Sequence, residues 1–304
     1  MSTIFVCGAT GTQGGSVINN LPGTPLKAHA IARDPSSETG QALKTAGVTL
    51  FKGDFDDEDS LRTAMQGCNS LFLNLMPNLA DVTQELAQAK RIISIAKEVG
   101  IEHIVYSSGL IHQAEHNPYW DETSFIAKII RSKQSVEAEV RSAEFKYYTI
   151  LRPGNFMTNY LAPFVNRMYP GLAETGEYTT AFLPETVIPM VDPNDIGKFG
   201  VVAFLEPGRF HGKEIPIASE LMVLGDILGA LSKFTGSEKK VDYMSQEEVD
   251  RQVKTNPFLA GQLIARDMVK SVDMDEVRSW GIQLGTFDEF LVREKDRVAK
   301  TYAQ

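Results

Sequence analysis

The stretch that decides the fold is Ile4-Phe5-Val6-Cys7-Gly8-Ala9-Thr10-Gly11-Thr12-Gln13-Gly14-Gly15, near the amino terminus. Its first four residues are a continuous apolar run, which is typical of a parallel strand buried on both faces. The glycines repeat as GxxGxxG and open a segment, 12–21, that we expect to be helical. A pyrophosphate needs backbone amides at close range and the positive end of a helix, and a Cβ in the turn would block its approach. We therefore predict a phosphate-binding turn, with these cofactor-binding residues: Gly8, Thr10, Gly11, Thr12, Gln13 and Gly14.

Outward from this stretch, apolar strands alternate with amphipathic helices. We expect strands at 4–7, 28–31, 48–51, 71–75, 103–107 and 148–151. The clearest helix lies between the fourth and fifth strands, where one apolar face is formed by Val82, Leu86, Ala89, Ile93, Ala96 and Val99, and Gly100 ends it. This alternation predicts an α/β protein with a doubly wound parallel-sheet Rossmann fold.

The alternation stops after Arg152-Pro153-Gly154. We expect a nucleotide-binding Rossmann domain over 1–153 and a smaller, mostly helical C-terminal subdomain over 154–304, which forms a substrate-binding or lid region. The segment at about 187–205 is expected to return to the Rossmann core. Further helices are predicted at 222–235, 246–254, 258–270 and 286–300.

Composition and charge exclude several classes of protein. The 304 residues include 30 Lys+Arg and 39 Asp+Glu, a formal net charge of −9, so we expect no nucleic-acid partner. No signal peptide and no apolar run long enough for a membrane span is evident, so we expect a cytoplasmic protein with no membrane partner. The two cysteines, Cys7 and Cys68, are expected to be buried thiols. His112 and His116 have a spacing that suits zinc on a helix, but no third ligand accompanies them, so we expect no metal site.

The end of the second strand indicates which dinucleotide binds. In this fold an acidic residue there binds the ribose hydroxyls of NAD, whereas an arginine accommodates the 2′-phosphate of NADP. The sequence Ile31-Ala32-Arg33-Asp34-Pro35 places Arg33 at this position, which predicts NADP(H) as the cofactor. The alternative is that Arg33 is a solvated strand end. Asp34 either contributes to the ribose site or initiates the loop before Pro35.

Four segments together resemble the NmrA-like family of atypical short-chain dehydrogenase/reductases, whose relatives include isoflavone reductases and NADP-sensing proteins. They are Gly8 to Gly15, Lys52 to Asp57, Ile104 to Gly109, and Leu151 to Phe156. The resemblance implies that Arg33 contacts the 2′-phosphate and that Asp54 and Phe55 border the adenine. It also implies that three residues after the fourth strand lie along the cofactor, namely Asn74, Leu75 and Met76. A later segment would face the nicotinamide, namely Pro153, Gly154, Asn155 and Phe156. Independently of the resemblance, Asp54 either lies at the ligand edge of the sheet or caps the next helix.

The catalytic residues are harder to predict. Typical short-chain dehydrogenases carry a Tyr-x-x-x-Lys pattern, and Lys133 resembles the family lysine, but Ile129 stands where the tyrosine would be. Lys133 is therefore either a proton donor, a ribose ligand only, or a solvated helix lysine. Ser108, at the end of the fifth strand, is a candidate donor to a substrate carbonyl. Tyr119 and His112, from the following loop, are candidate substitute acids.

Two functions follow from these residues. The first is an NADPH-dependent oxidoreductase that transfers hydride to a small apolar carbonyl, enone, imine or quinone-like substrate. The second is a non-catalytic NADP(H)-binding redox sensor that binds a regulatory protein partner. A set of apolar residues either lines a substrate pocket or forms core: Phe156, Met157, Tyr160, Phe164, Met168, Tyr169 and Phe182. Neither the substrate nor the oligomeric state is predicted.

Overall fold

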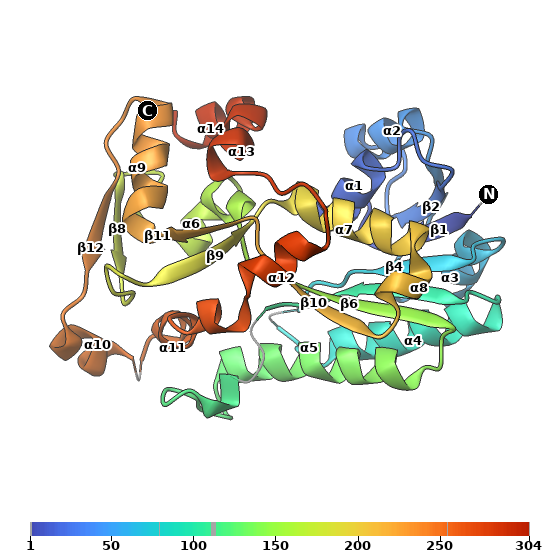
Figure 1. Ribbon diagram of the computed structural model, residues 1–304, viewed down its shortest axis with the longest axis horizontal. Coiled ribbons are helices and arrows are strands. Elements are labelled where there is room, and N and C mark those ends of the chain that lie inside the picture. Colours follow the sequence, from blue (N-terminus) through green and yellow to red (C-terminus); the bar gives the residue numbers. More distant parts are fainter. Residues whose placement is uncertain (1, 79, 111–113, 254, 304) are drawn as a thin grey trace. The chain divides into compact units, whose positions relative to one another are not determined.

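The computed structural model describes residues 2–78, 80–110, 114–253 and 255–303. Seven strands form its main sheet, in the order β10-β6-β5-β4-β1-β2-β3 (Figure 1). The strands are β1 (Thr3–Val6), β2 (Lys27–Ala32), β3 (Thr49–Lys52), β4 (Ser70–Leu73), β5 (His103–Ser107), β6 (Tyr147–Pro153) and β10 (Lys213–Ile217). The pairs from β3 through β2, β1, β4 and β5 to β6 are all parallel. Since chain order reverses at β1, where β4 pairs on the other side from β2, the doubly wound arrangement is confirmed.

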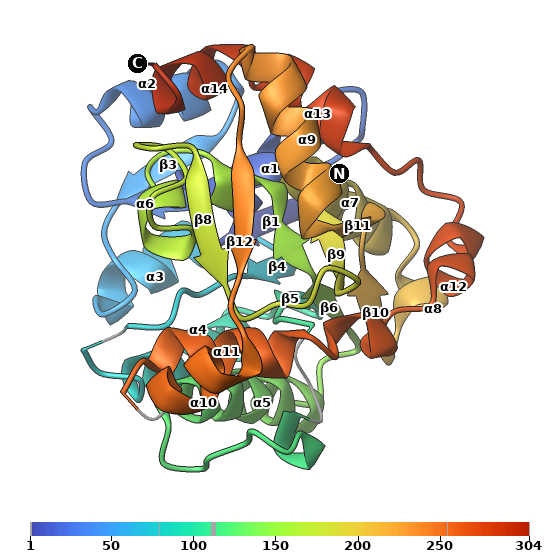
Figure 2. The ribbon, with the colours of Figure 1, turned by 90° about the vertical axis from the view of Figure 1, so that its left-hand side faces the viewer.

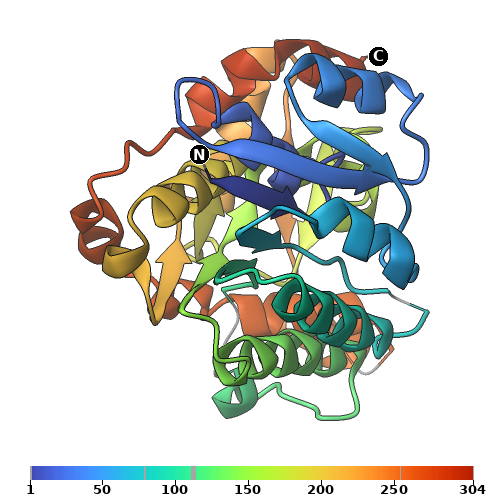
Figure 3. The ribbon, with the colours of Figure 1, turned by 90° about the vertical axis from the view of Figure 1, so that its right-hand side faces the viewer.

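Helices cover both faces of this sheet (Figure 3). They are α1 (Thr12–Asn19), α2 (Glu38–Thr45), α3 (Glu58–Met65), α4 (Gln84–Glu98), α5 (Phe125–Ser142), α7 (Pro193–Leu205) and α8 (Pro207–Phe210). Alternate strand residues such as Phe5 and Tyr106 enter one apolar core with side chains from α3, α4 and α5. On the opposite face α1 packs against α7, and the Ser16 hydroxyl donates to the Pro193 carbonyl at 2.6 Å.

The chain divides into two compact units. The first consists of Met1–Gly109, Ile129–Arg152 and Pro193–Ile215, and the second of Leu110–Lys128, Pro153–Asp192 and Pro216–Gln304. The first unit contains most of the main sheet and all of the helices listed above except the first residues of α5. The boundaries at 1–153 and 154–304 and the core role of 187–205 stay predictions.

The second unit contains two small sheets as well as helices (Figure 2). One has the order β11 (Glu220–Val223), β9 (Val187–Val191), β7 (Asn155–Phe156), and the other pairs β8 (Glu177–Thr180) in parallel with β12 (Lys240–Tyr243). Its helices are α6 (Val165–Met168), α9 (Leu224–Thr235), α10 (Gln246–Gln252), α11 (Pro257–Ala265), α12 (Met274–Ser279), α13 (Phe287–Arg293) and α14 (Lys295–Thr301). The helix predicted over 286–300 is interrupted at Glu294, whose backbone leaves helical geometry.

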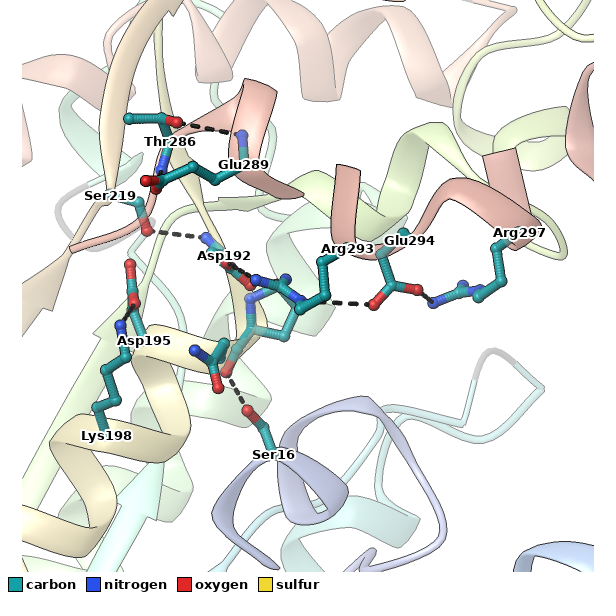
Figure 4. Close-up of polar contacts among 12 residues, drawn as sticks. Ser16, Asp192, Asp195, Lys198, Ser219, Thr286, Glu289, Arg293, Glu294 and Arg297 are labelled. Carbon is teal, nitrogen blue, oxygen red and sulfur yellow. Dashed lines mark hydrogen bonds and ion pairs between the residues drawn. The ribbon is translucent and has the colours of Figure 1, made fainter. Parts of the chain in front are cut away.

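An ion pair between a buried carboxylate and a partly exposed arginine links the end of β9 to α13 (Figure 4). Asp192 has no exposed surface, and its carboxylate accepts from both terminal nitrogens of Arg293, at 2.7 and 2.8 Å. The backbone N–H of Asp192 donates to the Ser219 hydroxyl at 2.9 Å. Every polar atom named here has a partner within the second unit, so we assign this cluster to stability.

Two further searches cover the described residues. No helix among them is long and apolar enough to cross a bilayer. No three His, Cys, Asp or Glu side chains in that part of the chain are grouped so that they could hold a metal ion. His112 lies outside the described residues, and His116 ends a short 3-10 helix, Ala114–His116. Cys7 and Cys68 are both buried free thiols.

His103 makes the stability of the first unit depend on pH. Its ring is 5% exposed and lies 5.1 Å from the Phe204 ring. Burial, and then the like charge of His211, lower the pKa of His103 from 6.5 to about 4. The unfolded chain therefore binds a proton on His103 at a higher pH than the folded chain does. The contribution of neutral His103 to the free energy of unfolding is complete above pH 6.5 and declines as the pH falls toward 4.

We expect the free energy of unfolding to decrease by up to about 3 kcal/mol over this interval through His103. Urea unfolding at a series of pH values measures this slope. His103→Phe should flatten it, whereas His116→Gln, which changes an exposed histidine, should leave it unchanged. Equal slopes for His103→Phe and the wild type would contradict the assignment.

Candidate functional site

The glycine turn leaves no room for side chains between β1 and α1. Gly8 has a φ of +64°, and the Gly11 N–H donates to the Gly8 carbonyl at 2.8 Å. A Cβ on Gly14 would lie 2.4 Å from the Gly8 carbonyl oxygen and 2.6 Å from that of Cys7. α1 begins after Gly11 without a side-chain cap, so the N–H groups of its first turn have no side-chain acceptor among the described residues. This geometry suits a pyrophosphate.

A chain of polar side chains crosses the sheet edge beside this turn. The Ser107 hydroxyl donates to Gln13 Oε1 at 2.6 Å, and Gln13 Nε2 donates to Asn74 Oδ1 at 3.0 Å. Thus Gln13 and Asn74, both predicted cofactor residues, lie together. Ser107, at the end of β5, extends this chain through its hydrogen bond to Gln13. These contacts fix the ends of β4 and β5 relative to the glycine turn.

Arg33 and Asp34, at the end of β2, differ in their contacts. The Arg33 side chain is exposed, and no described carboxylate lies within salt-bridge distance of it. The Asp34 carboxylate instead accepts from the Ser36 backbone N–H at 2.9 Å and from the Ser36 hydroxyl at 2.5 Å. These hydrogen bonds lower the pKa of Asp34, as does, more weakly, the charge of Lys52. Asp34 therefore initiates the loop, and the exposed cations Arg33 and Lys52 are both near the strand end.

Replacing Arg33 by serine is expected to weaken NADPH binding about 10- to 100-fold, which corresponds to the loss of a hydrogen-bonded charge pair. NADH affinity should stay unchanged, because NADH has no 2′-phosphate. Calorimetric titration with both nucleotides measures the difference. Lys27→Ser is the matched control, since it removes one exposed positive charge from the other end of β2. Equal losses of NADPH affinity in the two variants would contradict a specific role for Arg33.

The loop after β3 places Asp54 and Phe55 near the same edge. Asp54 Oδ1 accepts from the Asp56 N–H at 2.8 Å, and Arg91 donates to the Phe55 carbonyl at 3.0 Å. Asp57 caps α3 by accepting from the Ser60 N–H at 3.2 Å. The cap is thus Asp57, and Asp54 is free of that role. The assignment of Asp54 and Phe55 to the adenine stays a prediction.

Lys133 projects from α5 toward the end of β4. Its ammonium donates to the Leu75 carbonyl at 2.8 Å and forms an ion pair with Glu85 Oε1 at 2.5 Å. The side chain is 18% exposed, so Lys133 is not the solvated helix lysine that the sequence left open. Its polar contacts among the described residues are therefore one hydrogen bond, to Leu75, and one ion pair, to Glu85; its role toward a ligand stays a prediction.

Ser108 faces α5. It is 7% exposed, and its hydroxyl lies beside the Glu137 carboxylate, whose pKa it helps to lower. Glu137 also accepts from Arg152 at 2.6 and 2.9 Å. The candidate catalytic serine therefore adjoins a charged cluster within the first unit, and its catalytic role stays a prediction.

Of the remaining predicted residues, Thr10, Thr12 and Met76 belong to the first unit, and the others belong to the second. Asn155 donates to the Tyr169 hydroxyl at 3.1 Å, Pro153 ends β6, and Phe156 is half-buried. Tyr119 is 37% exposed, and its backbone N–H donates to Asn117 Oδ1 at 2.9 Å. Four members of the aromatic and methionine set are core of this unit rather than pocket lining: Met157, Tyr160, Tyr169 and Phe182.

Sequence reasoning missed two residues near the site, Glu85 and Lys52. Glu85 was detectable, because it lies four residues before Ala89 on the apolar face of the predicted helix, where a charged residue is unusual. Lys52 begins one of the four segments that resemble the family, but that segment by itself gives Lys52 no role. Its place beside Arg33 depends on the register that pairs Ala32 with Lys52.

Together, the glycine cradle, the free arginine and the aligned strand ends fit a dinucleotide that carries a 2′-phosphate. They define a Rossmann-type dinucleotide-binding protein.

The model of the NmrA-like family matches residues 1–282, and the chain belongs to this family. Among similar proteins is the NmrA-like family domain-containing oxidoreductase malD of Malbranchea aurantiaca, 28% identical over 78% of this chain and 74% of that protein. Another is the oxidoreductase FrzB of Cladobotryum sp, 28% identical over 77% of this chain and 74% of that protein. The resemblance predicted from the four segments is thus confirmed.

Solved structures show the same fold. The negative transcriptional regulator NmrA, in complex with NADP, has a TM-score of 0.75 at 20% identity and covers 98% of this chain and 97% of its own. Triphenylmethane reductase of Citrobacter sp., complexed with NADP(H), has a TM-score of 0.70 at 21% identity over 96% and 99% of the two chains. An NADPH-dependent quinone oxidoreductase of Escherichia coli has a TM-score of 0.67 at 24% identity, over 95% and 98%. The expected cofactor is therefore the one these proteins hold or use.

Proposed function

We propose that this chain is an NADPH-dependent reductase of small apolar carbonyl, enone, imine or quinone-like molecules. The observation that carries the proposal is the placement of Lys133: a lysine ammonium held at the end of β4 by Leu75 and Glu85, at the ligand edge of the sheet. The printed names of the relatives support it, since malD and FrzB are called oxidoreductases and two fold neighbours are reductases of a quinone and a triphenylmethane.

The residues of the first unit would hold the cofactor as the sequence predicted. The glycine turn and first turn of α1 would bind the pyrophosphate, and Arg33 the 2′-phosphate. Bound NADPH supplies a hydride to an electrophilic carbon. As the electron pair of the C=O or C=N bond moves to oxygen or nitrogen, Lys133 Nζ would donate a proton there and recover it from water. Lys133 would thus donate the proton that the tyrosine donates in typical short-chain dehydrogenases, where this chain has Ile129.

Absorbance of NADPH tests the proposal directly. Purified protein is offered NADPH with a panel of enones, quinones, imines and aldehydes, and Lys133→Met is compared with the wild type. Lys128→Met is the matched control, because Lys128 is an exposed lysine of the same helix. We expect a loss of kcat/KM of about a hundredfold or more in Lys133→Met, the lower end of the effect of removing a proton donor, and none in Lys128→Met. Oxidation of NADPH at equal rates by wild type and Lys133→Met would remove the proposal.

A second function has its own support. Ile129 occupies the place of the tyrosine in typical short-chain dehydrogenases, and the fold neighbour NmrA is a regulator. A sensor would bind NADP(H) and change its affinity for a regulatory protein between the oxidised and reduced forms. Recovery of bound proteins is compared with NADP+, with NADPH and without nucleotide. Identical recovery in all three conditions would remove the sensor hypothesis.

A further inference from the structure

Glu85 is a buried carboxylate that is paired with a candidate site residue, Lys133. It is the second residue of α4, and its side chain has no exposed surface. One carboxylate oxygen lies 2.5 Å from Lys133 Nζ, and the other accepts from the Ser132 hydroxyl at 2.8 Å. Both partners are consecutive residues of α5, the helix that packs beside α4 (Figure 3).

A purely structural pair would not need this arrangement. A buried carboxylate is costly unless it is paired and hydrogen-bonded, and an apolar residue at the same helix position would avoid that cost. The other buried residues of α4 are all Ala or Ile, such as Ala89 and Ile92. The ammonium also lies 5.9 Å from the centre of the buried Tyr106 ring, so Lys133 is held between an anion, a carbonyl and an aromatic face.

We propose that Glu85 is the positioning residue of Lys133: it holds the ammonium at the end of β4, with one N–H directed to the bound nucleotide or substrate. The proposal rests on the proposed reductase function for its effect on rate. The hydrogen bond to the Leu75 carbonyl fixes the position of Nζ along the strand end, and the ion pair with Glu85 fixes it from the side of α4. The role concerns Lys133 alone, since Glu85 is sealed from any ligand.

The test compares Glu85→Gln with Glu139→Gln. Glu139 is the matched control, because it pairs with Lys90 at 3.1 Å between the same two helices, but with both side chains partly exposed. The activity-independent readout is the nitrogen-15 NMR signal of the Lys133 ammonium, assigned by its loss in Lys133→Arg. A paired, shielded ammonium exchanges its protons slowly, so we expect the signal in the wild type and in Glu139→Gln, and its loss in Glu85→Gln.

Rate and nucleotide binding give the second readout. Glu85→Gln should lower kcat by about tenfold, as for a proton donor that is present but misplaced, with KM for the electrophile little changed. NADPH affinity should fall in Glu85→Gln and not in Glu139→Gln. Glu85→Asp keeps the charge but draws it back by one methylene, and it should recover part of the rate.

The outcomes separate this proposal from the reductase. If the wild type reduces no acceptor, the reductase proposal fails, and the ammonium signal and NADPH affinity still decide the role of Glu85. If Glu85→Gln keeps the signal, the kcat and the NADPH affinity of the wild type, the positioning role is overturned while the reductase stands. Should Glu85→Gln not fold, Glu85→Asp carries the test, and a wild-type rate and signal in that variant would overturn the proposal.

Discussion

Replacing Gly14 by alanine should destabilise the first unit by about 3 kcal/mol or more, at the upper end of the cost of overpacking, and should abolish NADPH binding. The added Cβ would lie 2.4 Å from the Gly8 carbonyl oxygen and 2.5 Å from its carbon, both backbone atoms that no side-chain rotation can move. α1 would have to shift away from β1, and the turn between them would lose the shape that admits a pyrophosphate. Urea unfolding and calorimetric titration with NADPH measure the two effects.

Gly229→Ala is the matched control for this substitution. Gly229 lies inside α9, and nothing lies within 4 Å of the position its Cβ would take. The same change of residue should therefore stabilise the chain by about 0.5–1 kcal/mol, through helix propensity alone. A Gly14→Ala protein with the unfolding midpoint and NADPH affinity of the wild type would show that the turn is not packed as described.

The strands of the main sheet were predictable because each is a short apolar run bounded by turn residues. The six predicted strands all occur, with no end displaced by more than two residues; β4, for example, ends at Leu73 and leaves Asn74 free to bind Gln13. Gly100 ends α4 with a φ of +88°, as its position after the apolar stripe indicated. Local pattern suffices in such cases because burial on both faces leaves a strand little choice of register.

The strands of the second unit were not predictable in the same way. β8 has only four residues, Glu177–Thr180, and pairs in parallel with β12, more than 50 residues later in the chain. Nothing in either segment identifies the other, so the pairing is decided by tertiary packing. The site shows the same division. Gly14 and Arg33 were readable from local spacing, whereas the chain from Ser107 through Gln13 and the pairing of Glu85 with Lys133 exist only once the strands and helices are assembled.

A cluster of four charges in the first unit carries the second large effect. Glu137 of α5 is 4% exposed and accepts from Arg152 at 2.6 and 2.9 Å and from Arg141 at 2.7 Å. Glu214 accepts from both arginines, at 2.6 Å each. Burial by itself would raise the pKa of Glu137, but the hydrogen bonds and charge of Arg152 outweigh it, so that the pKa is lowered. Glu137 is therefore a buried anion that depends on Arg152.

Arg152→Met should lower the free energy of unfolding by about 3–5 kcal/mol at neutral pH, because it leaves the Glu137 charge buried with half its partners. Arg62→Met is the matched control: Arg62 also donates two hydrogen bonds to one carboxylate, Glu98, but on the surface, so its loss should cost less than about 1 kcal/mol. Urea unfolding monitored by circular dichroism measures both variants.

Two further measurements separate the unpaired charge from a simple loss of packing. Arg152→Met combined with Glu137→Leu should recover most of the stability, since the double variant buries no unpaired charge and Arg141 keeps Glu214 as its partner. Lowering the pH should also reduce the difference in the free energy of unfolding between Arg152→Met and the wild type. Protonation of Glu137 removes the unpaired anion in the variant, while in the wild type the lowered pKa means that stability is lost as the pH falls through it. Two results would contradict this explanation: a difference in the free energy of unfolding that stays constant with pH, or a double variant no more stable than Arg152→Met. Either would show that Arg152 stabilises the fold through the packing of its aliphatic stem and not by pairing with the Glu137 charge.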